Sequence, residues 1–387
     1  MEGSWWKSRN ELDEKQEAVI MLPLDGKYIV TGPPGCGKTN LLVLRAAYLT
    51  KAGLKNLKIL TFGTALSDFV RTGVEGKGLD PGQVDRHVRW GRAIAVGANP
   101  DCKDVLDGIA KLDDRRHAIA EECKKVQSQA GPGARLHQVI LVDEVQDLFA
   151  DELDVIVGAS DRIMLAGDSR QRVYRGGNAV QRANQLGFTQ HQLAMHYRMG
   201  HAIAKVADRI FEPDHPSHSL SATCNYDETK MKSSAELLEL KDRDEQFSRL
   251  SGKLKNQLKA YPKEIIGILA AKKSAVNDLR ARFAGTELEQ HVVFHDEDSE
   301  GFGGSGRIHV MTIVAAKGTE FRAVHLYACE EISNVQDNQT LWYTAVTRAK
   351  TSLTAYASPG DRPLSRILMA GFAEDSQLPN LDSLFDE

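Results

Sequence analysis

The stretch "GPPGCGKT", from Gly32 to Thr39, carries the clearest structural signal in this chain. It fits the spacing G-x-x-x-x-G-K-[ST] and lies between a β-rich run, "KYIVT", and a helical run, "NLLVLRAAYL". Glycines in such a turn let backbone N–H groups point at phosphate oxygens, and the helix that follows adds the positive end of its dipole. The pattern predicts a phosphate-binding loop made of Gly32, Pro33, Pro34, Gly35, Cys36, Gly37, Lys38, Thr39 and Asn40.

Two side chains of this loop have the chemistry of a nucleotide site. Lys38 is placed to reach the β- and γ-phosphates of a nucleotide, and Thr39 is placed to ligate Mg²⁺. ATP and Mg²⁺ are therefore the expected cofactors. The alternative is a glycine-rich turn that binds nothing, and it is disfavoured because the flanking strand and helix are both present.

A second stretch, "LVDEVQD" from Leu141 to Asp147, supplies carboxylates at the end of an apolar strand. Asp143 is placed to hold Mg²⁺ through water, and Glu144 to orient and deprotonate the attacking water. Taken alone, an Asp-Glu pair after a strand is more often a helix cap or an exposed turn. Because the phosphate loop precedes it, we interpret the pair as part of an ATP hydrolase.

Short apolar runs that precede amphipathic stretches recur along the chain, and this pattern is typical of parallel α/β layers. Several of the runs are apolar throughout, as expected of strands that are covered on both faces. The charged segment 101–128 has helical periodicity and indicates an inserted helical subdomain. The predicted strands are "KYIVTG", "LKILTF", "QVILVDE", "DRIMLAGD", "EIIGILAA", "IHVMTI" and "RAVHLYA".

Composition limits the remaining possibilities. At 387 residues with 42% hydrophobic content, the chain can bury a sizeable core and form two or three domains. Its 49 basic and 53 acidic residues leave a formal charge of −4, so nucleic-acid binding would need a local basic groove. The five cysteines form no CxxC pair, and no uncharged run is long enough to span a membrane. We expect a cytoplasmic, reducing location and no membrane partner.

The motifs resemble those of the UvrD/Rep-type superfamily 1 helicases, in the order found in that family. The resemblance implies that ATP is hydrolysed between two domains, with Lys38, Glu144 and a set of further residues around the nucleotide. Gln16 in "DEKQEAVI" would contact the base, Tyr197 would stack near the adenine, and Glu320 would face the ribose. The residues that the family places at the γ-phosphate are Gln171 in "GDSRQRVYRGG", Arg198 in "HYRMG" and Arg348 in "AVTRAK".

A second set of motifs implies a strand-binding surface in the same family. The expected nucleic-acid contacts are Phe62 in "ILTFGTALSDFV", His87 in "VDRHVRW", Tyr174, Thr312 and Lys317 in "VMTIVAAKGTEF". A lone histidine is more often structural than functional, which is the alternative for His87. The expected partner is single-stranded DNA or a duplex with a 3′ tail.

The resemblance also implies the architecture. The expected fold is α/β with two RecA-like P-loop NTPase domains, the first at 1–190 with a reduced helical insertion at about 85–135, and the second at 191–370. An acidic tail follows at 371–387. The implied function is an ATP-dependent DNA translocase or helicase that moves 3′→5′. A partner nuclease or a replication or repair protein is expected, and docking of the tail to a replication clamp through Leu384 and Phe385 is a weaker hypothesis.

Two other functions compete with translocation. One is a nucleic-acid-sensing ATPase subunit of a defence or repair complex, favoured by the small insertions and by Gly176, which stands where the family usually has an aromatic. The other is a viral-type superfamily 1 RNA helicase, which "PGCGKT" also resembles but "DEVQD" and the pair Lys317–Gly318 oppose. A P-loop ATPase without a nucleic-acid partner explains none of the strand-side motifs.

Overall fold

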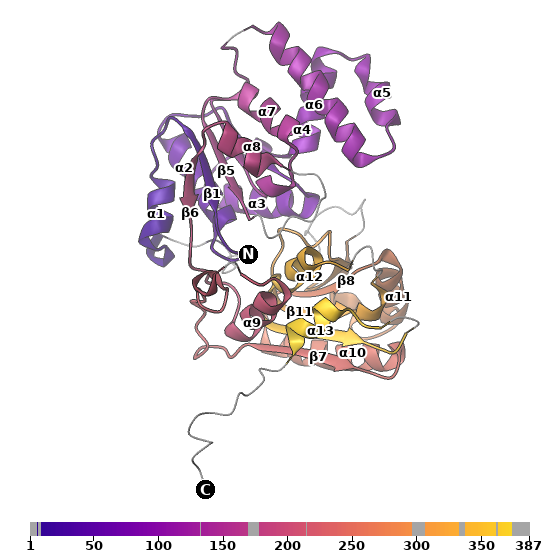
Figure 1. Ribbon diagram of the computed structural model, residues 1–387. Coiled ribbons are helices and arrows are strands. Elements are labelled where there is room, and N and C mark those ends of the chain that lie inside the picture. Colours follow the sequence, from indigo (N-terminus) through magenta and orange to yellow (C-terminus); the bar gives the residue numbers. More distant parts are fainter. Residues whose placement is uncertain are drawn as a thin grey trace.

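The computed structural model describes Trp6 and residues 9–131, 133–168, 178–213, 215–295, 306–332, 337–360 and 363–373. These residues form two lobes, and each lobe is built around a six-stranded parallel sheet with helices on its faces (Figure 1). The predicted fold class, two RecA-like α/β units with a helical insertion, is confirmed.

The first sheet has the strand order β3-β2-β4-β5-β1-β6. Because all its strands are parallel, the chain segments that follow β1, β4 and β5 meet at one edge of the sheet, where ligand sites of such folds form. The strands are β1 (Lys27–Thr31), β2 (Leu57–Thr61), β3 (Val84–Arg86), β4 (Val139–Val142), β5 (Ile163–Gly167) and β6 (Thr189–Gln192).

Among the described residues of this lobe, five helices pack on the sheet side and three more form the insertion between β3 and β4. The sheet helices are α1 (Glu14–Ile20), α2 (Lys38–Lys51), α3 (Thr64–Gly76), α7 (Ala150–Ala159) and α8 (Ala179–Gln185). The insertion consists of α4 (His87–Ala98), α5 (Cys102–Gly108) and α6 (Leu112–Gln129), and it lies at the top right of Figure 1. Helix α6 packs against both α4 and α7, so the insertion is anchored on the helix that follows the carboxylate strand.

The apolar strands have a core on each face, which explains why they lack alternation. In β4, Val139 and Leu141 pack with residues of α2 and α3, whereas Ile140 and Val142 pack with residues of α6 and α7. Successive side chains of a strand point to opposite faces, so a strand covered on both sides must be apolar throughout.

The second sheet has the order β7-β12-β11-β8-β10-β9 and is also parallel. Its strands are β7 (Ser234–Glu239), β8 (Ile266–Ala270), β9 (Val292–Phe294), β10 (Ile308–Thr312), β11 (Phe321–Tyr327) and β12 (Ala349–Ala357). Its helices are α9 (His201–Ile210), α10 (Arg243–Ala260), α11 (Lys273–Phe283), α12 (Gln339–Val346) and α13 (Arg366–Phe372).

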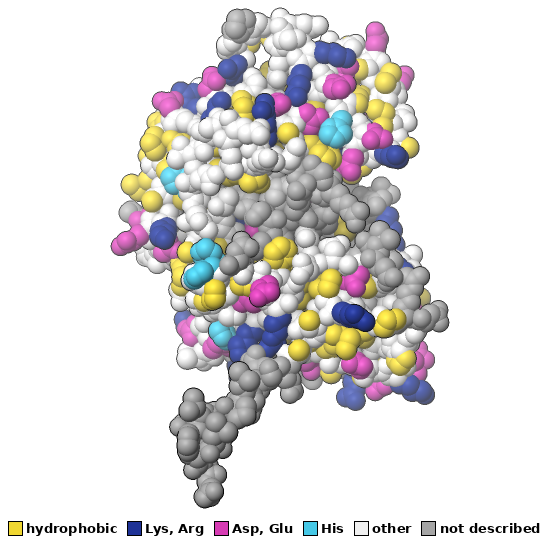
Figure 2. Space-filling view, viewed as in Figure 1, with side chains coloured by type: hydrophobic (Ala, Val, Ile, Leu, Met, Phe, Trp, Pro, Cys, Tyr) yellow, Lys and Arg dark blue, Asp and Glu magenta, His cyan; other side chains and the backbone are white. Residues whose placement is uncertain are grey.

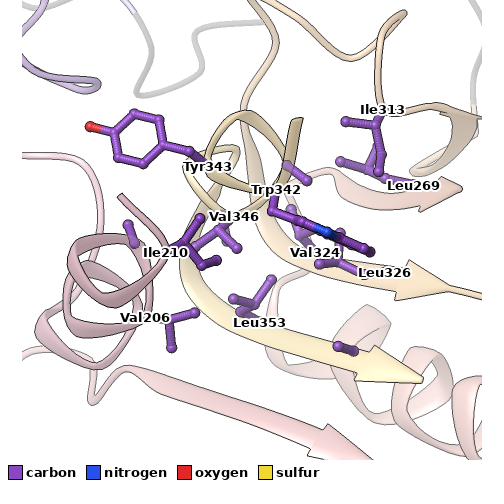
Figure 3. Close-up of a cluster of buried hydrophobic side chains, with 14 of the residues drawn as sticks. Val206, Ile210, Leu269, Ile313, Val324, Leu326, Trp342, Tyr343, Val346 and Leu353 are labelled. Carbon is purple, nitrogen blue, oxygen red and sulfur yellow. The ribbon is translucent and has the colours of Figure 1, made fainter. Parts of the chain in front are cut away.

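One face of the second sheet carries a large apolar cluster that joins three helices to the strands (Figure 3). Val206 and Ile210 of α9 and Val346 of α12 pack toward Leu326 of β11 and Leu353 of β12. This packing holds α9 and α12 in place, and each of these helices adjoins an arginine that the sequence assigns to the γ-phosphate. No helix among the described residues is long and apolar enough to cross a membrane.

Candidate functional site: a nucleotide pocket and the cleft beside it

The phosphate loop between β1 and α2 has a backbone that only glycine adopts easily. Gly35 and Gly37 have φ angles of 80° and 90°, in the left-handed region. A Cβ atom on Gly35 would lie 2.5 Å from Cβ of Arg198, which belongs to the second domain's side of the site. The glycines therefore permit both the loop conformation and the close approach of this arginine.

Lys38 and Thr39 begin α2 at the base of this loop. The Lys38 ammonium donates hydrogen bonds to the carbonyls of Gly32 (2.8 Å) and Pro33 (3.1 Å). The Thr39 hydroxyl donates to Oδ2 of Asp143 at 2.7 Å. The chain thus brings together a hydroxyl and a carboxylate that are 104 residues apart in the sequence.

Glu144 follows β4 in a left-handed conformation, with φ of 55°. Such a backbone is uncommon for a residue other than glycine and often marks a functional position. The Gln146 amide donates to the Glu144 carboxylate, and the same side chain accepts from the Asp168 N–H at 3.0 Å. Burial raises the pKa of Glu144, but the positive charges of Lys317, Arg348 and Lys38 outweigh it and hold this pKa below its usual range. Glu144 is therefore kept ionised, as a general base requires.

Asp143 lies behind Glu144 and is fully enclosed. Burial and the neighbouring Glu144 charge raise the pKa of Asp143 to about 6, although the hydrogen bond from Thr39 opposes this. A buried carboxylate of this kind is stabilised in its charged form by a cation.

The residues present fit a magnesium nucleotide. The Thr39 hydroxyl and the Asp143 carboxylate are oxygen ligands of the kind that Mg²⁺ prefers, and they already lie side by side. Asn40, the next residue of α2, is 7% exposed, and neither atom of its amide has a hydrogen-bond partner among the described residues. A buried amide without a partner is costly, and a ligand in the loop would supply one.

Arg198 reaches this pocket from the segment before α9 and is paired there. Its guanidinium forms an ion pair with Glu320, and the Lys350 ammonium lies 3.4 Å from the other carboxylate oxygen of Glu320. Burial, together with the charge of Arg348, lowers the pKa of Arg198 to about 9. Glu320 therefore lies between two partly buried cations at the edge of the nucleotide pocket.

Arg348 is 2% exposed and lies just before β12. Its guanidinium donates to the carbonyls of Thr344 (3.1 Å) and Thr319 (3.1 Å) and to the Thr347 hydroxyl (3.2 Å). These contacts hold the arginine through neutral groups. Its charge also lowers the pKa of Glu144, which shows that the two residues are electrostatically close.

Gln16 and Tyr197 lie together at the outer side of the phosphate loop. The Gln16 amide donates to the Cys36 carbonyl at 2.8 Å, and its oxygen accepts from the Asp13 N–H in a capping box that starts α1. The Tyr197 hydroxyl donates to the Asp13 carboxylate, and the Tyr197 N–H donates to the Gly35 carbonyl. The Gln16 side chain and the Tyr197 backbone thus support the loop backbone. Burial raises the pKa of the Cys36 thiol, which makes it a packing group and a poor nucleophile.

A cleft with a volume of about 710 Å³ runs beside this pocket, and both domains line it. The first domain supplies Phe62 and His87, and the second supplies Thr312 and Lys317, so the structure brings four predicted strand contacts to one place. Among the described lining residues, Glu144 is the acidic one. The basic ones are Arg86, Arg89, Arg92, Arg115, Arg116, Lys273 and Lys317.

The concentration of basic residues is a local feature of the cleft lining, which we call the basic wall. On the face shown in Figure 2, basic and acidic side chains are interspersed over both lobes. Some cleft cations have carboxylate partners, such as Arg92 with Asp107 and Lys317 with Asp147. Arg115, in contrast, donates to the Ile109 carbonyl, which leaves its charge uncompensated by that contact.

Phe62 and His87 form a stacked aromatic pair in the lining of the cleft, which we call the aromatic floor. The two rings stack with centroids 5.0 Å apart, and His87 is 5% exposed. The His87 Nε2 atom lies 3.2 Å from Oε1 of Glu152, and its Nδ1 atom lies 3.4 Å from the Thr61 carbonyl. His87 is therefore buried against Phe62. This position fits the structural interpretation of His87 better than a direct contact with the strand.

Several predicted residues lie outside the described part of the chain, namely Gln171, Tyr174 and Gly176, together with Leu384 and Phe385 of the tail. Two residues of the site were missed by the motif search. They are Arg116 of α6, which is buried, and Lys350 of β12, which is partly buried, and both lie close to predicted residues. Lys350 stands two residues after Arg348, so the alternation of a strand offered a weak signal, whereas Arg116 had none.

Residues 15–177 match a family model described as an AAA domain. A search of curated proteins finds no match to this chain. The matched region contains the phosphate loop, the Thr39–Asp143 pair and Glu144. The chain therefore carries a P-loop NTPase domain, a class that generally binds ATP with Mg²⁺.

Proposed function

We propose that this chain is an ATP-driven translocase or helicase on single-stranded nucleic acid, with DNA as the strand and 3′→5′ as the direction. The observation that carries the proposal is the position of the cleft. It has a basic wall from both domains and an aromatic floor at Phe62, and it reaches Glu144. Phosphate contacts supply sequence-independent affinity, and an exposed aromatic face supplies base stacking.

The nucleotide site is built to respond to movement of the two domains. The phosphate loop, Asp143 and Glu144 come from the first domain, whereas Arg198 and Arg348 come from the second. Mg²⁺ held by Thr39 and Asp143 would neutralise phosphate charge. Glu144 takes a proton from the attacking water, and the two arginines stabilise the charge that develops on the transferred group. Hydrolysis then depends on how closely the domains approach.

The ion pair between Arg198 and Glu320 can change its partners when the two domains approach each other. Arg198 exchanges the Glu320 carboxylate for a phosphate when it turns toward the nucleotide, and Lys350 stays beside Glu320. A strand that spans both walls of the cleft would be carried by the same closing movement. Repetition of closing and opening yields steps along the strand.

Steady-state ATP hydrolysis tests the proposal. The purified chain is assayed alone and with saturating single-stranded DNA, single-stranded RNA or blunt duplex, with Glu144→Gln as the inactive control. We expect stimulation by single-stranded DNA that the substitution abolishes. Selective stimulation by RNA would favour the RNA-helicase alternative. A rate that no nucleic acid changes would contradict the motor and leave a partner-gated ATPase.

A further inference from the structure

Arg116 of the inserted helix α6 is one of the largest fully buried side chains of the described chain. Its guanidinium forms a two-point contact with Glu152 of α7, from Nε to Oε1 at 2.8 Å and from Nη2 to Oε2 at 2.5 Å. A charged group in this position needs a complete set of partners, because an unpaired buried charge is strongly destabilising.

The same guanidinium lies close to two aromatic rings. Its central carbon is 5.1 Å from the centroid of Phe62 and 4.2 Å from that of Phe149. Phe62 also stacks on His87, whose Nε2 atom meets the Glu152 carboxylate. Phe62 therefore has two neighbours, Arg116 and His87, and the Glu152 carboxylate contacts both of them.

The Arg116 guanidinium also reaches the turn that contains Glu144, the proposed general base. Nη2 donates to the Asp147 carbonyl at 2.8 Å, and the Asp147 N–H donates to the Glu144 carbonyl at 3.0 Å. The Asp147 carboxylate in turn pairs with Lys317 of the second domain. One side chain of the insertion therefore contacts the cleft floor and the turn beside Glu144 at once.

We propose that Arg116 is a positioning residue that couples strand engagement at Phe62 to the placement of Glu144, so that the helical insertion serves as the link between the cleft and the ATP site. This inference rests on the proposed function, since it concerns the stimulation of hydrolysis by a strand. When a base stacks on Phe62, the ring can move only together with the guanidinium behind it. The same guanidinium holds the Asp147 carbonyl, so the movement reaches the Glu144 turn.

Arginine is needed here for its shape as well as its charge. Its flat, forked guanidinium stacks on aromatic rings and binds a carboxylate at two points while a further N–H reaches a carbonyl. A lysine keeps the charge and can keep the pair with Glu152, but it lacks the flat guanidinium that lies near both Phe62 and Phe149. The substitution Arg116→Lys therefore separates the coupling geometry from simple charge balance.

The experiment compares the wild type, Arg116→Lys and the matched control Arg135→Lys. Arg135 belongs to the same domain and pairs with Asp161 at 2.9 Å, away from the residues that line the cleft. Strand affinity is measured by fluorescence anisotropy. ATP hydrolysis is measured without strand and at saturating single-stranded DNA, and thermal denaturation checks folding.

For Arg116→Lys we expect a strand affinity close to that of the wild type and a ratio of stimulated to unstimulated rate that falls about tenfold. Arg135→Lys should keep the wild-type ratio. Wild-type stimulation by Arg116→Lys at saturating strand would overturn the proposal, and so would an equal loss of both rates. If Arg116→Lys does not fold, Glu152→Gln replaces it and must show the same loss of ratio.

This experiment distinguishes failure of the proposed motor function from failure of the coupling role of Arg116. If single-stranded DNA does not stimulate the wild type, the proposed function fails and the coupling role fails with it. If the wild type and Arg116→Lys are stimulated equally, the motor stands and the coupling role alone is wrong.

Discussion

Lys317 and Asp147 form a buried ion pair that joins the loop after β10 in the second domain to the "DEVQD" turn of the first. Burial raises the pKa of Asp147 to about 6 even though the lysine charge opposes it. The same lysine lowers the pKa of Glu144. The contact between the domains therefore also sets the electrostatics of Glu144, the proposed general base.

Replacing this lysine should cost both stability and activity. Lys317→Met leaves the Asp147 carboxylate buried without its partner, which costs roughly 3–5 kcal/mol when such a carboxylate stays ionised. We expect denaturant melts at pH 8 to show this loss. The double variant Lys317→Met/Asp147→Asn should recover most of the stability but not the ATPase rate. A single variant as stable as the wild type would contradict the assignment.

Gly35→Ala should weaken nucleotide binding. The position has a φ of 80° and a Cβ there would meet the Arg198 side chain, so the loop must deform. A strained backbone of this kind costs about 1–3 kcal/mol. Isothermal titration should show a Kd for ATP raised by about tenfold or more.

Gly53→Ala is the matched control for this substitution. Gly53 has a φ of 96°, but a Cβ there would meet no atom within 4 Å, and it lies after the end of α2. This variant should lose stability while keeping the wild-type Kd for ATP. An equal change of Kd in both variants would show that general loss of stability, and not deformation of the phosphate loop, explains the effect.

Phe62→Ala should weaken strand binding. Base stacking on an aromatic contributes roughly 1–3 kcal/mol per base, so anisotropy should show a marked rise in the Kd for single-stranded DNA. Phe62→Tyr keeps the ring and should bind nearly as well as the wild type. If both variants bind like the wild type, the strand does not pass over this ring.

Lys350 should make stability depend on pH above neutrality. Burial, assisted by the charge of Arg198, lowers the pKa of Lys350 to about 7. Between pH 7 and the ordinary lysine value of 10.5, the unfolded chain binds more protons at this residue than the folded chain does. The Lys350 contribution to the free energy of unfolding therefore rises with pH across that window.

This contribution can approach about 1.4 kcal/mol per pH unit for one proton. Lys350→Met should remove that part of the slope, as measured by urea melts between pH 7 and pH 9. The same slope in both proteins would show that Lys350 keeps an ordinary pKa in the folded chain.

Much of the fold was predictable because both sheets are parallel and covered. All seven apolar runs form strands, since buried parallel strands are continuous stretches of apolar residues. The strands that were missed are polar, mixed or only three residues long. In β6, "TQHQ" is polar and mostly exposed, and it is a strand only because its backbone pairs with β1 at the sheet edge.

The phosphate loop and the Asp143–Glu144 pair were predictable because their chemistry demands fixed spacing within a short stretch of sequence. Arg116 was not. It lies in the charged helix "LDDRRHAIAEECKKVQSQ" beside Arg115, and the two arginines look alike in sequence. Their difference arises from contacts with Glu152 and Asp147, more than thirty residues away, that only the folded insertion creates.

The most direct test of the account is the movement of the chain along single-stranded DNA. ATP is added by stopped flow to protein bound on strands of increasing length that carry a fluorophore at the 5′ or the 3′ end. Translocation in the 3′→5′ direction predicts a signal from the 5′ label whose delay grows with strand length, and a 3′ signal without such a delay. A 3′ signal whose delay grows with length would contradict the direction, and signals from both labels that do not depend on length, in a preparation whose ATPase is stimulated by the strand, would contradict translocation.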